Sequence, residues 1–409
     1  MATNAAAPAR ATTWQQVRAL AASPMAPFYL IAASVAVLSG LGLLMVLSSS
    51  SVIAASRGVS DFYYLGKQAS ALGVGLVGAV ALALLPPDVL RRMGWVAWGL
   101  AVVLLGLVLA LGTNIDGNQN WLKLGPVQFQ PSEFAKLALI VWCGTIFHLK
   151  RGRMHEPLQL ALPLLPFGGL VVALVLAGRD LGTGLILGAI LVMVMWFVGF
   201  PLRVLAPLGI AALALVGLLV YGSGNRMSRI AIFLDPQSNT DLSSQPMAAL
   251  YALASGGWWG AGLGASKQKW GGLKTGAHTD YIFAVIGEEL GLFGVLLVIG
   301  LFALLGWAGL EVALRSDKLF NRIVAAGITG WFMVQAVINI MVVMHLLPVL
   351  GVPLPFMSYG GTALMASLMA AGVLLALARN TPTARAYRAS RRPKSRPRMT
   401  SVMAASKED

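Results

Sequence analysis

Long apolar segments alternate with short polar segments along nearly the whole chain. The apolar runs are about 20 residues long, which is the length that an α-helix needs to cross a bilayer core of roughly 30 Å. Short strands of alternating polarity, the pattern of a membrane β-barrel, are not seen, so the sequence predicts an all-α integral membrane protein. We place about ten transmembrane helices, at residues 27–47, 68–86, 93–111, 133–147, 158–177, 181–200, 204–221, 281–304, 323–345 and 356–378.

Two of the predicted connections are much longer than the about two to eight residues that usually join bundled helices. They span residues 112–132 and 222–280, and the second lies between the seventh and eighth predicted helices. This second loop is rich in glycine and contains Trp258, Trp259 and Trp270. That composition is typical of a loop at the membrane interface, and long loops of this kind usually carry function.

The pattern divides the chain into three parts. Residues 1–25 form a polar N-terminal tail, residues 26–379 form the membrane domain, and residues 380–409 form a basic C-terminal tail. The first apolar run is too long and begins too late for a cleaved signal peptide, so we expect a retained anchor. Because the C-terminal tail is rich in Arg, Pro and Ser, we expect it to be disordered and to attract anionic lipid headgroups.

Composition and charge support a membrane protein and suggest its orientation. The 409 residues are 57% hydrophobic and 11% charged, which excludes an ordinary water-soluble core. The net charge of +15 is concentrated in short connections and in the tail, so it indicates topology rather than nucleic-acid binding. An even number of spans puts both termini on one side. About two thirds of the 30 lysines and arginines fall on that side, which predicts that the termini are cytoplasmic.

The clearest candidate for chemistry is the segment His278-Thr279-Asp280, where the long outer loop meets the next helix. Carboxylates at membrane depth are costly and are usually functional, so we favour a chemical role for Asp280 over a simple helix cap. Glu288 and Glu289 follow about two turns later, and for them we favour bracing of the helix bundle.

A second candidate segment runs from Trp121 through Gln130 to Glu133 and Lys136. Glu133 and Lys136 are three residues apart at a helix start, so they can pair on one face. A lysine near a helix N-terminus opposes the helix dipole and needs an anion, which can be Glu133 or a bound phosphate. A purely structural ion pair is the alternative.

Weaker candidates lie in turns. Asp180 begins a helix after a tight turn and Ser358 lies in a turn-like segment, and both residues fit ordinary turn and cap chemistry. The histidines lack metal-ligand spacing and no P-loop is present, so we predict no zinc site and find no support for an ATP-driven pump. No cofactor is specified by the sequence; a divalent cation, Mg²⁺ or Mn²⁺, is compatible with it. Cys143 lies in an apolar run and reads as a small buried hydrophobe.

Five blocks in this order resemble the SEDS (shape, elongation, division, sporulation) family between about residues 40 and 378. The segment Ser48-Ser-Ser-Ser-Val52 and the stretch beginning at His278 look more like the cell-division branch, FtsW, than the elongation branch, RodA. The blocks are Gln130-Pro-Ser-Glu-Phe-Ala-Lys136, Asp180-Leu-Gly-Thr183, the glycine-rich run 255–269, Ala277-His-Thr-Asp280 with Gly287-Glu-Glu-Leu-Gly291, and Leu347-Pro348 with Ser358-Tyr-Gly-Gly361.

The resemblance implies a ten-helix peptidoglycan glycosyltransferase that polymerises lipid II outside the inner membrane at the division septum. It implies a class B penicillin-binding protein and other divisome membrane proteins as partners, and no nucleic acid. Asp280 matches the essential acidic position of the family. The residues that we predict to bind substrate are Trp121, Gln130, Glu133, Lys136, Asp180, Lys269, His278, Thr279, Glu288 and Ser358.

The reaction that the resemblance implies needs a base and cations but no nucleotide, because a lipid-linked diphosphate is its own activated donor. Asp280 can be the base, and Lys136 with Arg179, Lys267 or Lys269 can supply the cations. The family turns an α-linked donor into a β-linked strand, which implies inversion in one step.

The chain departs from the family pattern in three places. Lys274-Thr-Gly276 replaces Leu-Pro-Glu, Asn120 replaces an arginine before Trp121, and Gly178-Arg179 replaces the usual pair before Asp180. Three other functions stay open: a lipid II flippase, an elongation-type polymerase, and a scaffold that only recruits a penicillin-binding protein.

Overall fold

The computed structural model describes residues 23–391 except 116–117, 126, 154–155, 157–158, 160–161, 237–239 and 274–275. Within this part, nine helices are long and apolar enough to cross a membrane. The all-α membrane fold predicted from the sequence is therefore confirmed. The nine helices are α2 (Ala26–Ser56), α3 (Tyr63–Leu84), α5 (Gly94–Leu111), α6 (Pro131–Leu149), α9 (Leu181–Val198), α10 (Leu202–Tyr221), α13 (Ile282–Arg315), α14 (Leu319–Val343) and α15 (Gly361–Arg379).

The fifth predicted span, residues 158–177, lies partly outside the described residues. The part that is described forms the π-helical turn η2 (Leu164–Gly168), which continues into α8 (Gly169–Ala177). Together they give an apolar helix over Leu164–Ala177, which is shorter than a full span. The count of ten spans therefore stays a prediction.

The helix boundaries differ from the apolar runs in a consistent way. Helix α2 continues nine residues beyond the predicted end, to Ser56, and α13 continues to Arg315. An apolar run marks the part of a helix that lies in hydrocarbon, while the helix itself continues wherever its backbone hydrogen bonds do. The last span begins at Gly361 rather than at 356, because the preceding segment is an irregular loop in which Phe356 has a φ of 65°.

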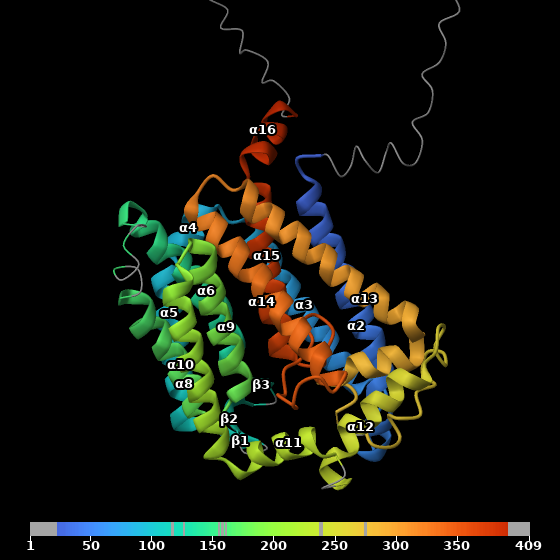
Figure 1. Ribbon diagram of the computed structural model, residues 1–409. Coiled ribbons are helices and arrows are strands. Elements are labelled where there is room, and N and C mark those ends of the chain that lie inside the picture. Colours follow the sequence, from blue (N-terminus) through green and yellow to red (C-terminus); the bar gives the residue numbers. More distant parts are fainter. Residues whose placement is uncertain are drawn as a thin grey trace, which may run out of the picture.

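Both long connections contain regular structure. The first folds into a three-stranded antiparallel sheet, with Thr113 opposite Trp121 and Leu122 opposite Phe129. The second begins with two helices that lie at the lower end of the molecule in Figure 1. The elements are β1 (Thr113–Ile115), β2 (Asn118–Leu124), β3 (Val127–Phe129), α11 (Gly224–Leu234) and α12 (Thr240–Ser255).

The opposite end of the molecule carries the short helices α4 (Pro87–Arg92) and α16 (Pro382–Ser390) and the 3-10 turn η1 (Arg151–Arg153). Helix α16 corrects our expectation that the whole C-terminal tail is disordered. Thr381 Oγ1 accepts a hydrogen bond from the Ala384 N–H at 3.4 Å and caps the helix, and Arg385 forms an ion pair with Asp317. The N-terminal tail up to residue 22 and residues 392–409 lie outside the described part of the chain.

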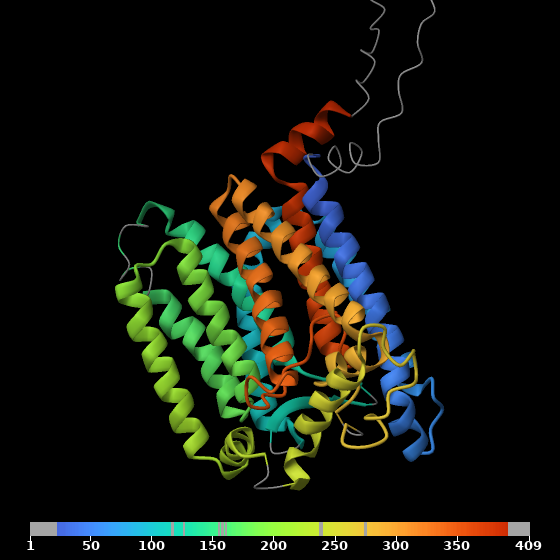
Figure 2. The ribbon, with the colours of Figure 1, turned by 45° about the vertical axis from the view of Figure 1, so that its right-hand side comes forward.

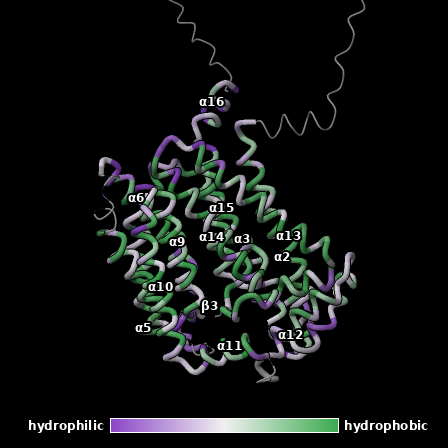
Figure 3. Tube along the Cα trace, in the orientation of Figure 1, coloured by the Kyte–Doolittle hydropathy of each residue, from purple (hydrophilic) through white to green (hydrophobic). Residues whose placement is uncertain are grey.

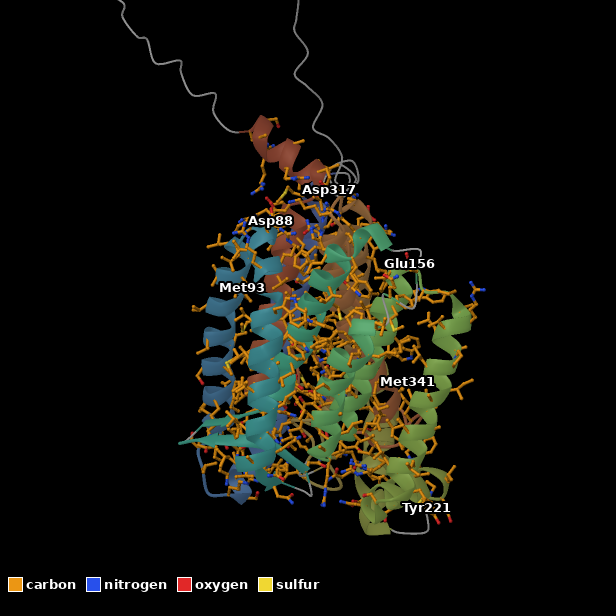
Figure 4. The ribbon with its side chains drawn as sticks, turned by 90° about the vertical axis from the view of Figure 1, so that its left-hand side faces the viewer. Asp88, Met93, Glu156, Tyr221, Asp317 and Met341 are labelled. Carbon is orange, nitrogen blue, oxygen red and sulfur yellow. The ribbon has the colours of Figure 1, made fainter. Side chains whose placement is uncertain are left out.

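The two ends of the helix bundle are separated by an apolar middle. Figure 4 places Asp88, Glu156 and Asp317 at the end that carries α16, and Tyr221 at the other end. In Figure 3 the middle of the bundle is mostly green and the polar purple segments gather towards the two ends. This is the polarity profile expected of a protein that spans a bilayer.

The centre of the bundle is formed by α6, α14 and α15, which are mostly buried, while α10 exposes most of its apolar surface. In the view of Figure 2, α10 lies along one side of the molecule. Close packing depends on small residues: a Cβ at Gly372 would lie 2.2 Å from the carbonyl oxygen of Ala79, so α15 and α3 meet backbone to backbone. Cys143 is fully buried, as predicted.

Candidate functional site

Asp280 lies in the turn before α13 and does not cap that helix. The helix begins at Ile282, and its N-cap residue, Tyr281, makes no side-chain cap hydrogen bond. The Asp280 side chain is partly exposed, and we find no described residue that hydrogen-bonds its carboxylate. A Cβ added to Gly351 would lie 3.8 Å from Asp280 Oδ2, so the loop before α15 passes close to the carboxylate. The capping alternative is therefore not supported, and the carboxylate is available for chemistry.

Electrostatics separate the roles of Asp280 and His278. Burial raises the pKa of Asp280 to about 6, although the positive charge of Arg229 opposes this shift. Burial, assisted by Arg57, lowers the pKa of His278 to about 4. At neutral pH the imidazole is therefore uncharged, whereas Asp280 is an ionised carboxylate of raised basicity.

His278 belongs to a cluster of aromatic rings. Its ring centroid lies 5.3 Å from that of Tyr64 on α3 and 5.2 Å from that of Tyr359. The His278 carbonyl accepts a hydrogen bond from the Tyr359 N–H at 2.8 Å. Nδ1 of His278 is buried, and we find no hydrogen-bond partner for it among the described residues. These contacts fix the loop segment that carries Asp280 against α3 and the loop before α15.

Glu133 and Lys136 form the buried ion pair that their spacing predicts. Lys136 Nζ lies 2.9 Å from both carboxylate oxygens and donates a hydrogen bond to Gln335 Oε1 at 3.0 Å. The ammonium group also lies 4.9 Å from the centroid of the Trp331 ring, and Trp331 donates to the same Gln335 oxygen at 2.7 Å. The lysine charge is therefore balanced by a carboxylate, an amide oxygen and an aromatic face.

Helix α14 connects this ion pair to Asp280. Gln335 Nε2 donates to the Pro353 carbonyl at 2.8 Å. One turn later, about 6 Å along the helix axis, Asn339 Nδ2 donates to the carbonyls of Asp280 and Val352, both at 2.8 Å. Two amides on one face of α14 thus hold the Lys136 pair, the turn of Asp280 and the loop before α15 in one network.

Gln335 and Asn339 were missed by our reading of the sequence. Their signal was present, because they are polar residues four apart within a long apolar span, and such residues usually face the bundle interior. Both side chains are about 1% exposed.

Asp180 is an N-cap whose carboxylate is fully engaged. It accepts hydrogen bonds from the Thr183 N–H at 2.9 Å and from Thr183 Oγ1 at 2.8 Å. Asn120 Nδ2 and Gln130 Nε2 donate to Asp180 Oδ2, the oxygen that also accepts from Thr183 Oγ1, at 2.8 and 3.2 Å. Asn120, which stands where the family commonly has an arginine, therefore ties β2 to α9, and Trp121 follows it in the same strand.

Glu288, Glu289 and Lys269 lie in a separate network that braces the glycine-rich loop. Lys269 Nζ lies 3.1 Å from Glu289 Oε1 and donates to the Gly264 carbonyl at 2.7 Å. Ser48 Oγ on α2 donates to Glu289 at 2.6 Å, and the Lys267 N–H donates to Glu288 at 2.8 Å. The bracing role that we favoured for the two glutamates agrees with these contacts.

The same loop supplies hydrogen bonds that are missing where α13 is interrupted. The helix is interrupted at Gly291, which has a φ of 66°, and the N–H groups of Ala261 and Gly262 donate to the carbonyls of Glu288 and Glu289 at 2.9 and 3.0 Å. A Cβ at Gly260 would lie 2.2 Å from the Glu289 carbonyl oxygen, so only glycine fits there. The loop is therefore an integral part of the helix bundle at this point.

Ser358 and Thr279 make local contacts. Ser358 Oγ accepts from the Leu354 N–H at 2.8 Å, and its carbonyl accepts from Gln68 Nε2 on α3 at 3.0 Å. Thr279 Oγ1 donates to the Gly276 carbonyl at 3.3 Å. Among the described residues, no group of three His, Cys, Asp or Glu side chains is arranged to hold a metal ion.

The fold therefore sorts the predicted site residues into three groups. Asp280, Glu133 and Lys136 share one network through α14. Asp180 and Gln130 are joined to each other at the small sheet, next to Trp121. The remaining members shape the loops, with Lys269 and Glu288 in the brace and His278, Thr279 and Ser358 around the turn of Asp280.

Comparison with known proteins matches this arrangement to one family. Residues 29–383 match the model of a cell cycle protein family named for FtsW, RodA and SpoVE. The chain is 37% identical over 364 residues to a probable peptidoglycan glycosyltransferase FtsW of Mycobacterium tuberculosis, covering 88% of this chain and 69% of the relative. It is 36% identical over 344 residues to the protein of the same name from Trichlorobacter lovleyi, covering 83% and 90%.

Two solved structures are similar in both fold and sequence. One is a chain from a peptidoglycan synthase complex that coordinates polymerization and crosslinking, with a TM-score of 0.70 and 31% identity over 86% of this chain and 97% of that one. The other is the rod shape determining protein RodA of Thermus thermophilus, with a TM-score of 0.63 and 29% identity over 86% and 96%.

Proposed function

Because the chain belongs to the cell cycle protein family of FtsW, RodA and SpoVE, we propose that it is a peptidoglycan glycosyltransferase that polymerises lipid II into glycan strands. Its relatives carry that activity in their names, and the matches cover most of both chains. It is a multi-pass membrane protein, since its family and its apolar helices agree on this. The naming of the relatives as FtsW supports a role in septal wall synthesis.

Asp280 is the proposed general base. The observation that carries this assignment is a carboxylate of raised pKa, without a hydrogen-bond partner among the described residues, whose backbone carbonyl is held by Asn339 in the turn just before α13. The hydroxyl of the acceptor sugar gives its proton to Asp280 as its oxygen bonds to the anomeric carbon of the donor. The bond from that carbon to the diphosphate breaks at the same time, and the lipid diphosphate leaves with the electron pair. This single displacement inverts the anomeric configuration.

The proposed orientation puts Asp280 outside the cytoplasm. The end that carries α16 also carries Asp88 and Asp317 (Figure 4), and the neighbouring connections hold many of the lysines and arginines. By the positive-inside rule this end, with both termini, faces the cytoplasm, and the loop of residues 222–280 faces outward. In a Cys143→Ala background, an impermeant thiol reagent on intact cells should label Ser244→Cys but not Ser401→Cys.

The proposed partner is a class B penicillin-binding protein, with other divisome membrane proteins around the pair. The support is the similarity to a chain of a complex that couples polymerization to crosslinking. The proposed location is the inner membrane at the septum. We retain the division into a membrane domain at residues 26–379 and two terminal tails as part of this proposal.

A polymerisation assay tests the function. The purified full-length chain is reconstituted with labelled lipid II, with and without a class B penicillin-binding protein, and products are resolved by length. When the assay is done in detergent micelles, lipid II reaches both faces of the protein directly. Glycan strands formed in micelles therefore need no flipping step. Transport of lipid II across vesicles without any polymer would favour a flippase, and inactivity with normal partner recruitment would favour a scaffold.

A further inference from the structure

The reaction needs a cation for the departing diphosphate, and the two buried lysines near the outer end are already neutralised. Lys136 is paired with Glu133, and Lys269 is paired with Glu289. Each ammonium also makes further hydrogen bonds within the protein, to Gln335 and to the Gly264 carbonyl respectively. A paired and enclosed lysine presents little net charge to a ligand, so the cation must come from elsewhere.

Three arginines form a cluster at the outer end of the bundle, which we call the arginine cluster: Arg179, Arg226 and Arg229. Arg226 on α11 donates from Nη2 to the Arg179 carbonyl at 2.8 Å and from Nη1 to the Leu219 carbonyl at 3.0 Å. Arg229, one turn later, donates from Nη1 to the Val349 carbonyl at 3.2 Å. Helix α11 thereby fixes the cluster to the turn before α9 and to the loop before α15.

Asp180 and Asp280 are close enough to interact with the charges of this cluster, but neither of them pairs with it directly. Among the residues that the structure describes, none of the three arginines takes part in an ion pair. The neighbouring Asp180 already accepts hydrogen bonds from Thr183, Asn120 and Gln130. Burial lowers the pKa of Arg226 and the charges of Arg179 and Arg229 lower it further, while the charge of Asp180 opposes this shift without reversing it. Adjacent like charges repel one another, so an anionic ligand would relieve a repulsion that is built into the fold.

The arginines keep donors available on the solvent side. Arg179 and Arg229 are exposed and Arg226 is partly exposed. Each guanidinium has several N–H donors. Towards the described residues, Arg226 uses two of them, Arg229 uses one and the Arg179 side chain uses none. Arg179 also has a φ of 66°, which is costly for a residue with a side chain and occurs often at ligand sites. A planar guanidinium group can donate two parallel hydrogen bonds to the oxygens of one phosphate, a geometry that an ammonium group does not offer.

The cluster is next to the proposed base. Arg229 is bonded to Val349, and Gly351 of the same loop lies against the Asp280 carboxylate. The positive charge of Arg229 acts to lower the pKa of Asp280, against the effect of burial. In Figure 1, α11 lies between the small sheet and α12, at the end of the molecule where α13 begins.

We propose that the arginine cluster binds the diphosphate of the lipid-linked donor and stabilises it as the leaving group. The inference rests on the proposed glycosyl transfer. When the bond between the anomeric carbon and the diphosphate oxygen breaks, the electron pair stays on that oxygen, and the guanidinium groups stabilise the added negative charge. The proton of the acceptor hydroxyl goes to Asp280. The base therefore acts on the attacking group, while the arginines act on the leaving group of the same displacement.

Kinetics on Arg226→Ala, Arg229→Ala and the double variant test this site. Each single change should raise the KM for lipid II about tenfold or more, as expected for losing a charge-assisted hydrogen bond, and the double variant should lose kcat as well. Arg229→Lys should recover part of the loss. Arg203→Ala, an exposed arginine at the start of α10, is the matched control and should behave like the parent. Parent-like KM and kcat in the double variant would overturn the proposal.

Binding of radiolabelled pyrophosphate separates this inference from the proposed activity. The full-length parent in phosphatidylcholine nanodiscs should bind pyrophosphate, and the double variant should lose at least about tenfold in affinity. This result would support the site even if the parent formed no polymer, an outcome that would instead overturn the proposed function. Equal binding by parent and double variant would contradict the site. Loss of binding when phosphatidylglycerol is added would assign the arginines to bulk lipid headgroups and would also overturn it.

Discussion

Two buried lysine–carboxylate pairs in this protein use the same chemical groups but make different further contacts. Lys136 with Glu133 and Lys269 with Glu289 have N–O distances of 2.9 and 3.1 Å, and all four side chains are at most 3% exposed. The Lys269 pair closes on the backbone of its own loop and on Ser48 of α2. The Lys136 pair continues through Gln335 and α14 to the turn of Asp280.

The difference shows that burial and pairing alone do not identify a catalytic residue. A buried ion pair is weak evidence of stability and no evidence of function until its further contacts are known. The Lys269 pair ends in a glycine-rich loop that replaces helical hydrogen bonds of α13. The Lys136 pair ends at a carboxylate of raised pKa without a partner among the described residues. We therefore expect the first pair to act on stability and the second on catalysis.

The largest effect is expected at the end of the Lys136 network, in Asp280→Asn. The amide keeps the size of the side chain but loses its basicity, so the polymerisation rate should fall by about 10² to 10⁴ while the protein stays folded. Since Asp280 makes no capping hydrogen bond, thermal unfolding should change little. The measurement is initial polymerisation rate on lipid II, with melting temperature and lipid II binding determined in parallel.

Asp61→Asn, an exposed carboxylate near the start of α3, is the control for loss of a charge near the membrane surface. It should retain parental activity. If Asp280→Asn polymerises within a few-fold of the parent, the base must be sought elsewhere, and Glu133 is the next candidate.

Neutralising each pair as a unit compares the two regions directly. Glu133→Gln with Lys136→Met, and Lys269→Met with Glu289→Gln, remove both charges and leave no unpaired ion, which limits the loss of stability. We expect the first double variant to lose about 10-fold or more in kcat because the Lys136 network positions Asp280. The second should keep kcat within a few-fold and lower the melting temperature.

The single variants Lys136→Ala and Lys269→Met leave a buried carboxylate unpaired and should both destabilise, by about 3 to 5 kcal/mol. Activity per folded molecule is the informative quantity for them. If Lys136→Ala loses activity and folded protein to the same extent, the Glu133–Lys136 pair has only a structural role, like the one expected for the Lys269–Glu289 pair.

The pH dependence of the reaction should report the Asp280 network and not the brace. A general base acts when deprotonated, so kcat/KM should fall about tenfold per pH unit below the raised pKa of about 6 and should level off above it. The acidic limb should stay in place when Lys269 and Glu289 are both neutralised, because none of the contacts between that pair and the described residues reaches Asp280. A shift of the limb in this variant would show that the two regions are coupled.

The smallest effect is expected for Ser48→Ala, which removes the hydrogen bond that Ser48 Oγ donates to the Glu289 carboxylate and the one that it accepts from Lys269 Nζ. Loss of a hydrogen bond to a buried charged group costs about 1 to 3 kcal/mol, so the melting temperature should decrease without a change in kcat. Ser51→Ala on the same helix is the control, since within the described part of the chain Ser51 Oγ donates to the Ser48 carbonyl and not to Glu289. A decrease in kcat for Ser48→Ala alone would give the brace a part in catalysis.

The sequence by itself determined the features that depend on local spacing. Apolar runs of membrane length predicted an all-α membrane protein, and the three-residue spacing predicted the Glu133–Lys136 pair, which is confirmed. The position of Asp180 after a tight turn is compatible with the cap that it forms. Five ordered blocks indicated the family. These inferences hold because helix geometry alone brings residues three or four apart together.

Only the tertiary structure decided which distant groups meet. Ser48 and Glu289 are 241 residues apart, and Lys136 and Gln335 are 199 apart, so no periodicity relates them. The sheet of residues 113–129, helix α16 and the start of α15 at Gly361 were also not predicted. Apolar runs show which segments lie in the membrane, but not which face of one helix meets which face of another. Side-chain packing fixes that choice. Here it places Lys136 in the network of the proposed base and Lys269 in the contacts that hold the glycine-rich loop.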